Sequence, residues 1–122
     1  MTEMNDDLAL DRSAYPSPRV IRSSSKFRMA RDRFKDRCRR VNAKCYWCCL
    51  RGDSEMAKID YYASANTPYA FELDHLRPVE THPELAFDPA NWVPSHCRCN
   101  RQKGTKSLER LERQGDWVKP DW

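Results

Sequence analysis

Long apolar segments are missing from this chain of 122 residues. No apolar stretch near the N-terminus has the length of a signal-peptide core, and no run approaches the roughly 20 residues of a membrane span. We therefore expect no membrane span and a reducing cytoplasmic location. Hydrophobic residues make up only 39% of the chain. Because a small domain with a modest core usually needs a staple, the six cysteines are candidates for disulfides or metal ligands.

The N-terminal residues also lack any sustained hydrophobic period. Residues 1–22 mix acidic residues, serine and proline, so we predict a flexible N-terminal arm there and one domain over residues 23–122. Between positions 19 and 51 twelve basic residues face only Asp32 and Asp36, although the net charge of the whole chain is only +4. Such a local excess predicts a polyanionic partner; its alternative is a solvated helix face.

The basic segment has the pattern of an amphipathic helix. Residues 26–41 contain no Gly or Pro, and the serine cluster 23–25 offers an N-cap. Its apolar residues recur every three or four positions and predict a narrow docking stripe: Phe27, Ala30, Phe34, Cys38 and Val41.

The C-terminal half contains shorter elements. Residues 69–73 predict a strand that ends at Asp74-His75, and residues 91–94 predict a second strand, so together they suggest a β-hairpin. Ser95 is an N-cap candidate for a helix over residues 96–103 that stops at Gly104. A last helix over residues 107–114 and a tryptophan-containing tail complete the segment 105–122. The predicted fold class is α+β.

Cys45-x-x-Cys48 predicts a zinc knuckle. His96 and Cys99 are favoured as the other two ligands, because residues i and i+3 share a helix face. Cys97 and Cys49 remain rival ligands. The competing redox interpretation of the cysteine pair is disfavoured, because the pair is predicted to follow a helix and precede a turn.

A second set of polar residues predicts catalysis. Asp74 and Asn100 offer oxygen ligands suited to Mg²⁺ or Mn²⁺. His75 has a pKa suited to a general base, and Asn91 on the partner strand is expected to orient its imidazole by hydrogen bonding.

These motifs together resemble those of small, zinc-stapled HNH endonucleases of the bacteriophage type. The resemblance covers about half of the chain, from residue 45 to 104, and rests on these pieces: Cys45-x-x-Cys48, Ile59-Asp60-Tyr61, Phe71-Glu-Leu-Asp74-His75-Leu-Arg-Pro78, Asn91-Trp92 and His96-x-x-Cys99-Asn100-x-x-Lys103-Gly104. It implies a ββα-metal (His-Me finger) core over residues 69–104, with the structural zinc and flanking helices added. Asn100 stands where the family often has histidine, which favours Mg²⁺ or Mn²⁺.

The resemblance also implies an activity. Asp74 and Asn100 are expected to bind the catalytic ion, His75 to act as general base, and Asn91 to be the middle motif residue. The expected function is hydrolysis of DNA phosphodiester bonds with low sequence specificity, in the host cytoplasm if a phage encodes the chain. The resemblance also implies a role beside the packaging terminase. The sequence carries no dimerisation signal. The alternatives are a zinc-stapled nucleic-acid-binding module without catalysis and a thiol oxidoreductase. The basic residues expected to contact DNA are Arg77, Arg98, Arg101, Lys103, Arg33, Arg37 and Arg40.

Overall fold

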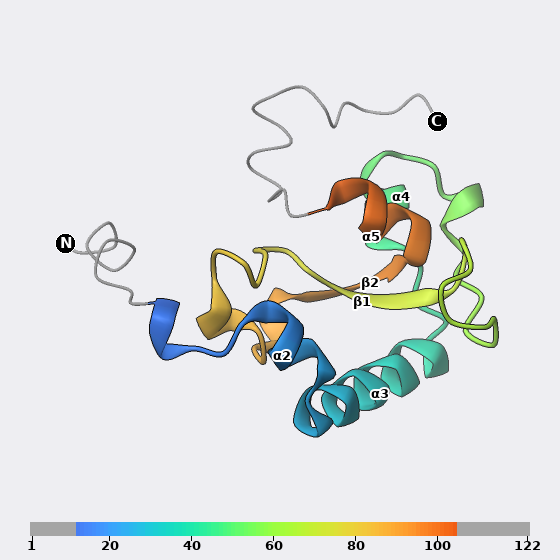
Figure 1. Ribbon diagram of the computed structural model, residues 1–122. Helices are drawn as coiled ribbons and strands as arrows, with labels where there is room; N and C mark the ends of the chain where they lie inside the picture. The colour runs from blue at the N-terminus through green and yellow to red at the C-terminus, as the bar shows by residue number, and fades with distance from the viewer. Residues whose placement is uncertain (1–11, 105–122) are drawn as a thin grey trace.

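A two-stranded antiparallel sheet lies at the centre of the computed structural model, which describes residues 12–104. Strand β1 (Phe71–His75) pairs with β2 (Trp92–His96), and the register runs from Phe71 opposite His96 to His75 opposite Trp92. Helix α3 (Ser25–Arg40) packs against β1 on one side, and α4 (Tyr46–Leu50) and α5 (Cys97–Lys103) contact the strands on the other (Figure 1). This arrangement confirms the α+β class with a ββα core and flanking helices.

Helix α3 confirms the predicted basic helix to within one residue at either end. Ser24 caps it, because the serine hydroxyl accepts a hydrogen bond from the Phe27 amide at 3.1 Å. The predicted stripe is correct for Phe27 and Cys38, which are buried, but wrong for Val41. Val41 is the C-cap residue and is 74% exposed, since the helix ends before it can turn toward the sheet.

Two buried clusters share the apolar residues. The cluster between α3 and the sheet contains Ile21, Phe27, Leu73, Val79, Ala86 and Trp92. The other surrounds the cysteines and contains Trp47, Ile59 and Tyr61 besides the thiols. Phe34 and Phe71 pack against both clusters, so α3 is connected to the sheet and to the cysteine-rich region by the same two rings.

The predicted N-terminal arm is wrong for its last residues. Helix α2 (Pro18–Ser23) begins with proline at its first position, and the Ser17 side chain accepts from the Val20 amide. Ile21 is buried, which fixes α2 against the core. Ser17 and Pro18 therefore mark the capped start of a helix and not part of a flexible arm. Residues 1–11 and the predicted helix and tail over residues 105–122 lie outside the described residues.

The hairpin also differs from the prediction in its boundaries. Asp74 and His75 lie inside β1, where their backbone pairs with β2, whereas Asn91 lies in the 3-10 helix η4 (Pro89–Asn91) that precedes β2. Ser95 is not an N-cap, since it lies in β2 opposite Glu72; His96 occupies the cap position of α5. The stop at Gly104 is confirmed by its φ of +63°.

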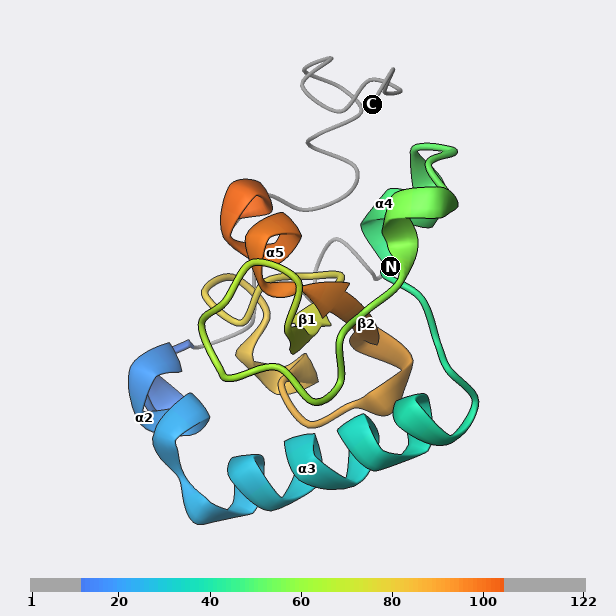
Figure 2. The same ribbon diagram turned by 90° about the vertical axis from the view of Figure 1, so that its right-hand side faces the viewer.

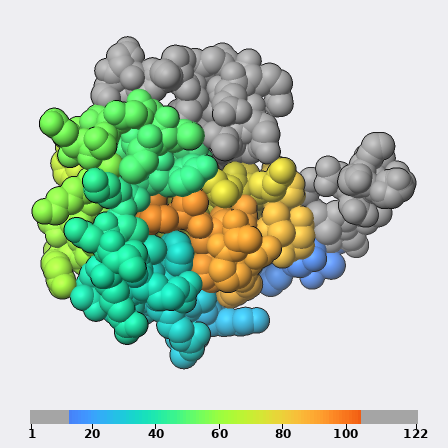
Figure 3. Space-filling view, turned by 180° about the vertical axis from the view of Figure 1, so that it is seen from behind, coloured from blue at the N-terminus to red at the C-terminus, as the bar shows by residue number. Residues whose placement is uncertain are grey.

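The remaining 3-10 helices are η1 (Arg12–Ala14), η2 (Glu55–Ala57) and η3 (Pro83–Leu85). The loop after β1 carries η3 and η4 back to the start of β2. From behind, the orange segment of β2 and the residues before it lie between the teal end of α3 and the yellow loop after β1 (Figure 3). Within the described part of the chain, no helix has the length and apolar character to cross a membrane.

Candidate metal centre and active site

Four of the predicted metal ligands meet in one place. The ligand atoms of Cys45, Cys48, His96 and Cys99 all lie within 4.8 Å of one another, and all four side chains are buried. Cys45 is the N-cap residue of α4, and His96 and Cys99 come from the junction of β2 with α5. The short helix α4 contains Cys48, and the turn predicted after the cysteine pair is confirmed at Arg51 and Gly52. The objection to a redox pair now rests on the imidazole and third thiol that complete the group.

The imidazole of His96 is oriented toward the sulfur atoms. Its Nε2 lies 2.7 Å from the Lys58 carbonyl, which can only accept a hydrogen bond, so Nε2 carries the proton. Nδ1 then presents its lone pair 3.6 Å from the Cys48 Sγ and 3.7 Å from the Cys99 Sγ. A metal-bound histidine usually donates its other ring N–H to a carbonyl or carboxylate group in this way. The rivals are outside the group: Cys49 is exposed, and Cys97 is buried elsewhere.

When no cation is present, ionisation is favoured at one of the three thiols and disfavoured at the other two. The hydrogen bond with Cys45 and burial both raise the pKa of the Cys99 thiol, and burial raises that of Cys48 to about 11. The hydrogen bond from Cys99 lowers the pKa of Cys45. A divalent cation removes this conflict, because thiolates are the forms that bind metal. Three sulfurs and one imidazole form a donor set compatible with structural zinc.

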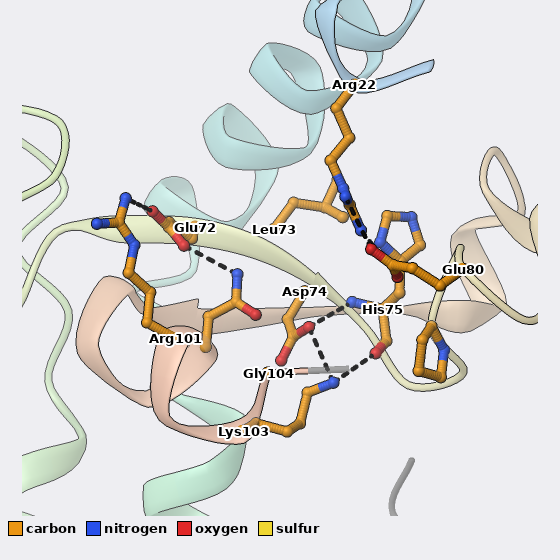
Figure 4. Close-up of a pocket in the computed structure, with 11 residues that line it drawn as sticks. Arg22, Glu72, Leu73, Asp74, His75, Glu80, Arg101, Lys103 and Gly104 are labelled. Carbon is orange, nitrogen blue, oxygen red and sulfur yellow. Dashed lines mark hydrogen bonds and ion pairs between the residues drawn. The ribbon is translucent and has the colours of Figure 1, made fainter. Parts of the chain in front are cut away.

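A separate cavity of about 260 Å³ opens beside β1 (Figure 4). It is bounded by β1, by the C-terminal half of α5 and by Arg22 of α2, which forms a salt bridge with Glu80. The cavity therefore brings together residues from both ends of the described chain. Its polar lining comprises Arg22, Glu72, Asp74, His75, Glu80, Asn100, Arg101 and Lys103.

Asp74 is a buried carboxylate with three donors. Oδ2 accepts from the Trp47 indole at 2.6 Å; Oδ1 accepts from the His75 amide at 2.7 Å and lies 3.4 Å from the Lys103 ammonium. Burial raises the pKa of Asp74 to about 6, although Lys103 and Trp47 act in the opposite direction. A carboxylate offers about four acceptor positions. One position on Oδ2 is thus left for a further ligand.

His75 is held by a carbonyl group and an aromatic ring. Nε2 lies 3.0 Å from the Ala86 carbonyl, so it carries the proton and leaves the lone pair on Nδ1. The ring stacks on Phe27 with 5.9 Å between centroids. Burial lowers the pKa of His75, which keeps the imidazole neutral at neutral pH. A neutral imidazole in a cavity with a buried carboxylate can accept a proton from water.

The predicted hydrogen bond from Asn91 to His75 is wrong. The Asn91 amide accepts from the Arg77 amide at 2.9 Å and donates to the Arg77 carbonyl at 3.0 Å. Its own carbonyl accepts from Leu76 at 2.8 Å. Because Asn91 lies in η4 and not on β2, it closes the turn after β1, and Ala86 orients the imidazole in its place.

Glu72 was missed by the sequence analysis. Its Oε1 accepts from Asn100 Nδ2 at 2.8 Å, and its Oε2 lies 3.4 Å from the Arg101 guanidinium. A carboxylate can only accept, so Glu72 fixes the Asn100 side chain with its nitrogen toward Glu72 and its amide oxygen pointing elsewhere. That oxygen is the atom a hard cation would bind. Position 72 precedes Asp74 by two, so the two side chains share a strand face. That period was the available signal.

The basic residues divide into buried and exposed groups. Lys103 was predicted to contact DNA, but it is 2% exposed and donates to the His75 carbonyl at 3.2 Å, so it supports the site from within. Arg98 lies over the Tyr69 ring at 4.9 Å and is half-buried. The other predicted DNA contacts stay predictions and are exposed: Arg33, Arg37, Arg40, Arg77 and Arg101.

Comparison with known proteins agrees with this geometry. The family model of the HNH endonuclease matches residues 47–106, a span that contains the whole cavity-lining segment from Glu72 to Gly104. No curated protein and no solved structure matches the chain. The match covers both strands of the sheet and α5. Asp74 and His75 lie in β1, and Asn100 lies in α5. Residues 47–106 therefore form an HNH endonuclease domain.

Proposed function

We propose that this protein is a metal-dependent DNA endonuclease that hydrolyses phosphodiester bonds with low sequence specificity. The observation that carries the proposal is the convergence of Asp74, His75 and Asn100 on one cavity, with the imidazole fixed as a base by the Ala86 carbonyl. A module that only binds nucleic acid has no use for a buried carboxylate beside an oriented, neutral imidazole.

The residues of the site have distinct roles in the proposed reaction. His75 accepts the proton of the attacking water through Nδ1. Asp74 and Asn100 would hold one Mg²⁺ or Mn²⁺ through oxygen atoms, a donor set that suits these hard ions. When bound, such an ion supplies positive charge to the scissile phosphate and the leaving oxygen. Glu72 keeps the Asn100 oxygen available, and Lys103 and Trp47 hold the Asp74 carboxylate in place.

The Cys45–Cys48–His96–Cys99 group is proposed to bind zinc for stability and not for catalysis. Four protein ligands complete a tetrahedral site, whereas catalytic zinc keeps an open position. Asp74 is hydrogen-bonded by Trp47, which lies between two of the cysteines in sequence. The proposed zinc site therefore also fixes one partner of the active-site carboxylate.

Cleavage of supercoiled plasmid tests the proposal. The purified chain is incubated with Mg²⁺, with Mn²⁺ or without added ion, beside His75→Ala and the control His82→Ala. His82 is a loop histidine whose ring bonds only Thr81 among the described residues. We expect metal-dependent nicking or linearisation by the wild type and His82→Ala, and its loss in His75→Ala with DNA binding and zinc content unchanged.

Binding of DNA without cleavage under every ion would overturn the catalytic proposal and leave the zinc-stapled binding module. A role in phage DNA processing beside the packaging terminase stays a prediction. Co-purification of the chain with a phage terminase, retained in His75→Ala, is the result we expect from that prediction. Failure to co-purify at low salt would contradict it.

A further inference from the structure

The active-site cavity continues into a larger groove. The groove has a volume of about 510 Å³ and shares Arg22, Glu72, Leu73, His75 and Asn100 with the cavity. From there it runs between α3 and the loop over residues 63–66, the two segments that border the sheet in Figure 2. Whatever enters the groove therefore reaches His75 at one end.

The α3 wall of the groove is cationic. Phe27, Arg31, Asp32 and Lys35 of α3 line the groove. The two cations, Arg31 and Lys35, are four residues apart and so lie on the same face of the helix, about 6 Å apart along its axis. Among the described residues none forms an ion pair with Lys35. Arg31 contacts Asp32 at 3.2 Å, but both side chains are exposed, and such a pair contributes little.

The other surfaces of the groove leave room for a chain. The loop residues that line it, Ala63, Ala65 and Asn66, are small or uncharged, and Phe71 of β1 also lines the groove. The acidic members are Asp32, which pairs with Arg31, and Glu72, which bonds Asn100 and Arg101. Both acids thus have cationic or amide partners, and Lys35 is left to bind an anion.

The cations predicted from the sequence to bind DNA lie on a different side of α3. Arg33 follows Arg31 by two positions, which is about 200° around the helix axis. Arg37 is one turn further along the same side as Arg33, with its guanidinium 5.6 Å from the Phe34 ring centroid. Neither residue lines the groove. The helix therefore has two basic rows, and only the row of Arg31 and Lys35 adjoins the active site.

We propose that this groove binds the sugar–phosphate backbone of the DNA strand being cut, next to the scissile phosphate, through Arg31 and Lys35. The proposal rests on the nuclease function proposed above. The backbone is polyanionic and extended, as the charge and shape of the groove require. The row of Arg33 and Arg37 then faces away from the bound strand.

The test compares two charge-matched double variants, Arg31→Gln/Lys35→Gln and Arg33→Gln/Arg37→Gln. Glutamine keeps helix propensity, and thermal unfolding confirms that both variants fold. Binding of a fluorescent duplex oligonucleotide is measured against salt in a His75→Ala background, so that the DNA stays intact. Two lost phosphate contacts lower the log–log salt slope by about 1.8, which makes the loss of affinity between 50 and 200 mM salt about 12-fold smaller.

We expect this change for Arg31→Gln/Lys35→Gln and the wild-type slope for Arg33→Gln/Arg37→Gln. The single variant Lys35→Arg keeps the positive charge and should preserve the wild-type salt slope. An equal or larger change in the Arg33/Arg37 variant would overturn the proposal.

Catalysis supplies the second readout. With His75 intact, Arg31→Gln/Lys35→Gln should raise KM for plasmid DNA and hydrolyse the small diester bis(p-nitrophenyl) phosphate as the wild type does. Loss of small-diester hydrolysis would show damage to the catalytic residues and would also overturn the proposal. If the wild type hydrolyses neither substrate, the nuclease function fails, while the binding comparison still decides which row of α3 meets DNA.

Discussion

Lys103 and Asp74 form a buried ion pair, and breaking it should lower the free energy of unfolding substantially. The two residues are 2% and 4% exposed, and Nζ lies 3.4 Å from Oδ1. Lys103→Met keeps the length and apolar stem of the side chain and removes only the ammonium. The Asp74 carboxylate is then buried with the Trp47 indole and the His75 amide as its remaining donors.

The expected cost follows from the geometry of the pair. Removing one partner of a buried pair typically costs about 3–5 kcal/mol, because the other charge stays uncompensated. Since Asp74 keeps two hydrogen bonds, we expect the lower end, about 3 kcal/mol. That is a large part of the stability of a domain, which is of the order of 5–15 kcal/mol.

Urea unfolding at constant excess zinc measures the effect. Wild type, Lys103→Met, Asp74→Asn and the double variant form a double-mutant cycle, and Lys44→Met is the control because Lys44 is exposed. We expect the double variant to lose at least about 1 kcal/mol less than the sum of the single variants. Lys44→Met should stay within about 0.5 kcal/mol of wild type.

Two results would refute this reasoning. Additivity within about 0.5 kcal/mol would mean that the two residues do not act as a pair. A lower salt slope of DNA binding in Lys103→Met would mean that the ammonium contacts phosphate, as the sequence alone had predicted, and that it is not buried in solution.

The other predictions concern the zinc group, the base and the amide of the active site. Chelation of zinc or Cys48→Ser should unfold the protein, since structural zinc contributes of the order of 10 kcal/mol of folding free energy. Cys49 is exposed, so Cys49→Ser should keep the wild-type midpoint of unfolding measured by circular dichroism. Equal effects of Cys48→Ser and Cys49→Ser on that midpoint would contradict the ligand set. Because burial lowers the pKa of His75, the acid limb of kcat/KM should have its midpoint below about 6.5, with activity lost as the pH falls through it; a midpoint above 7 would exclude this base. Glu72→Ala should raise the Mg²⁺ concentration for half-maximal cleavage, because the Asn100 amide can then rotate. Glu72→Gln retains an acceptor and should keep the wild-type Mg²⁺ concentration. Equal Mg²⁺ dependence in the wild type and both variants would argue against this positioning role.

Local spacing made the metal-binding residues predictable. Two cysteines three positions apart, and a histidine and a cysteine three positions apart, converge because the backbone geometry over one helical turn is nearly fixed. The serine before α3 and the glycine after α5 were predictable for the same reason, since caps act within three or four residues. The strand boundaries were displaced by about two residues, because pairing with β2 extended β1 through Asp74 and His75.

The partners of the catalytic residues were not predictable in this way. Trp47 donates to Asp74 across 27 positions, and Ala86 is a backbone carbonyl whose side chain carries no signal. Asn91 lies just before β2 and bonds the Arg77 backbone, so its position in the motif did not reveal its partner.

The sequence by itself determined which residues can bind metal, which residue can act as a base, and that one helix carries an excess of positive charge. The tertiary structure alone decided that Lys103 is buried against Asp74 and that Arg31 and Lys35, and not Arg33 and Arg37, adjoin the active site. The physical reason is that residue type and short spacing define chemistry and local geometry, whereas burial and orientation depend on how distant segments pack.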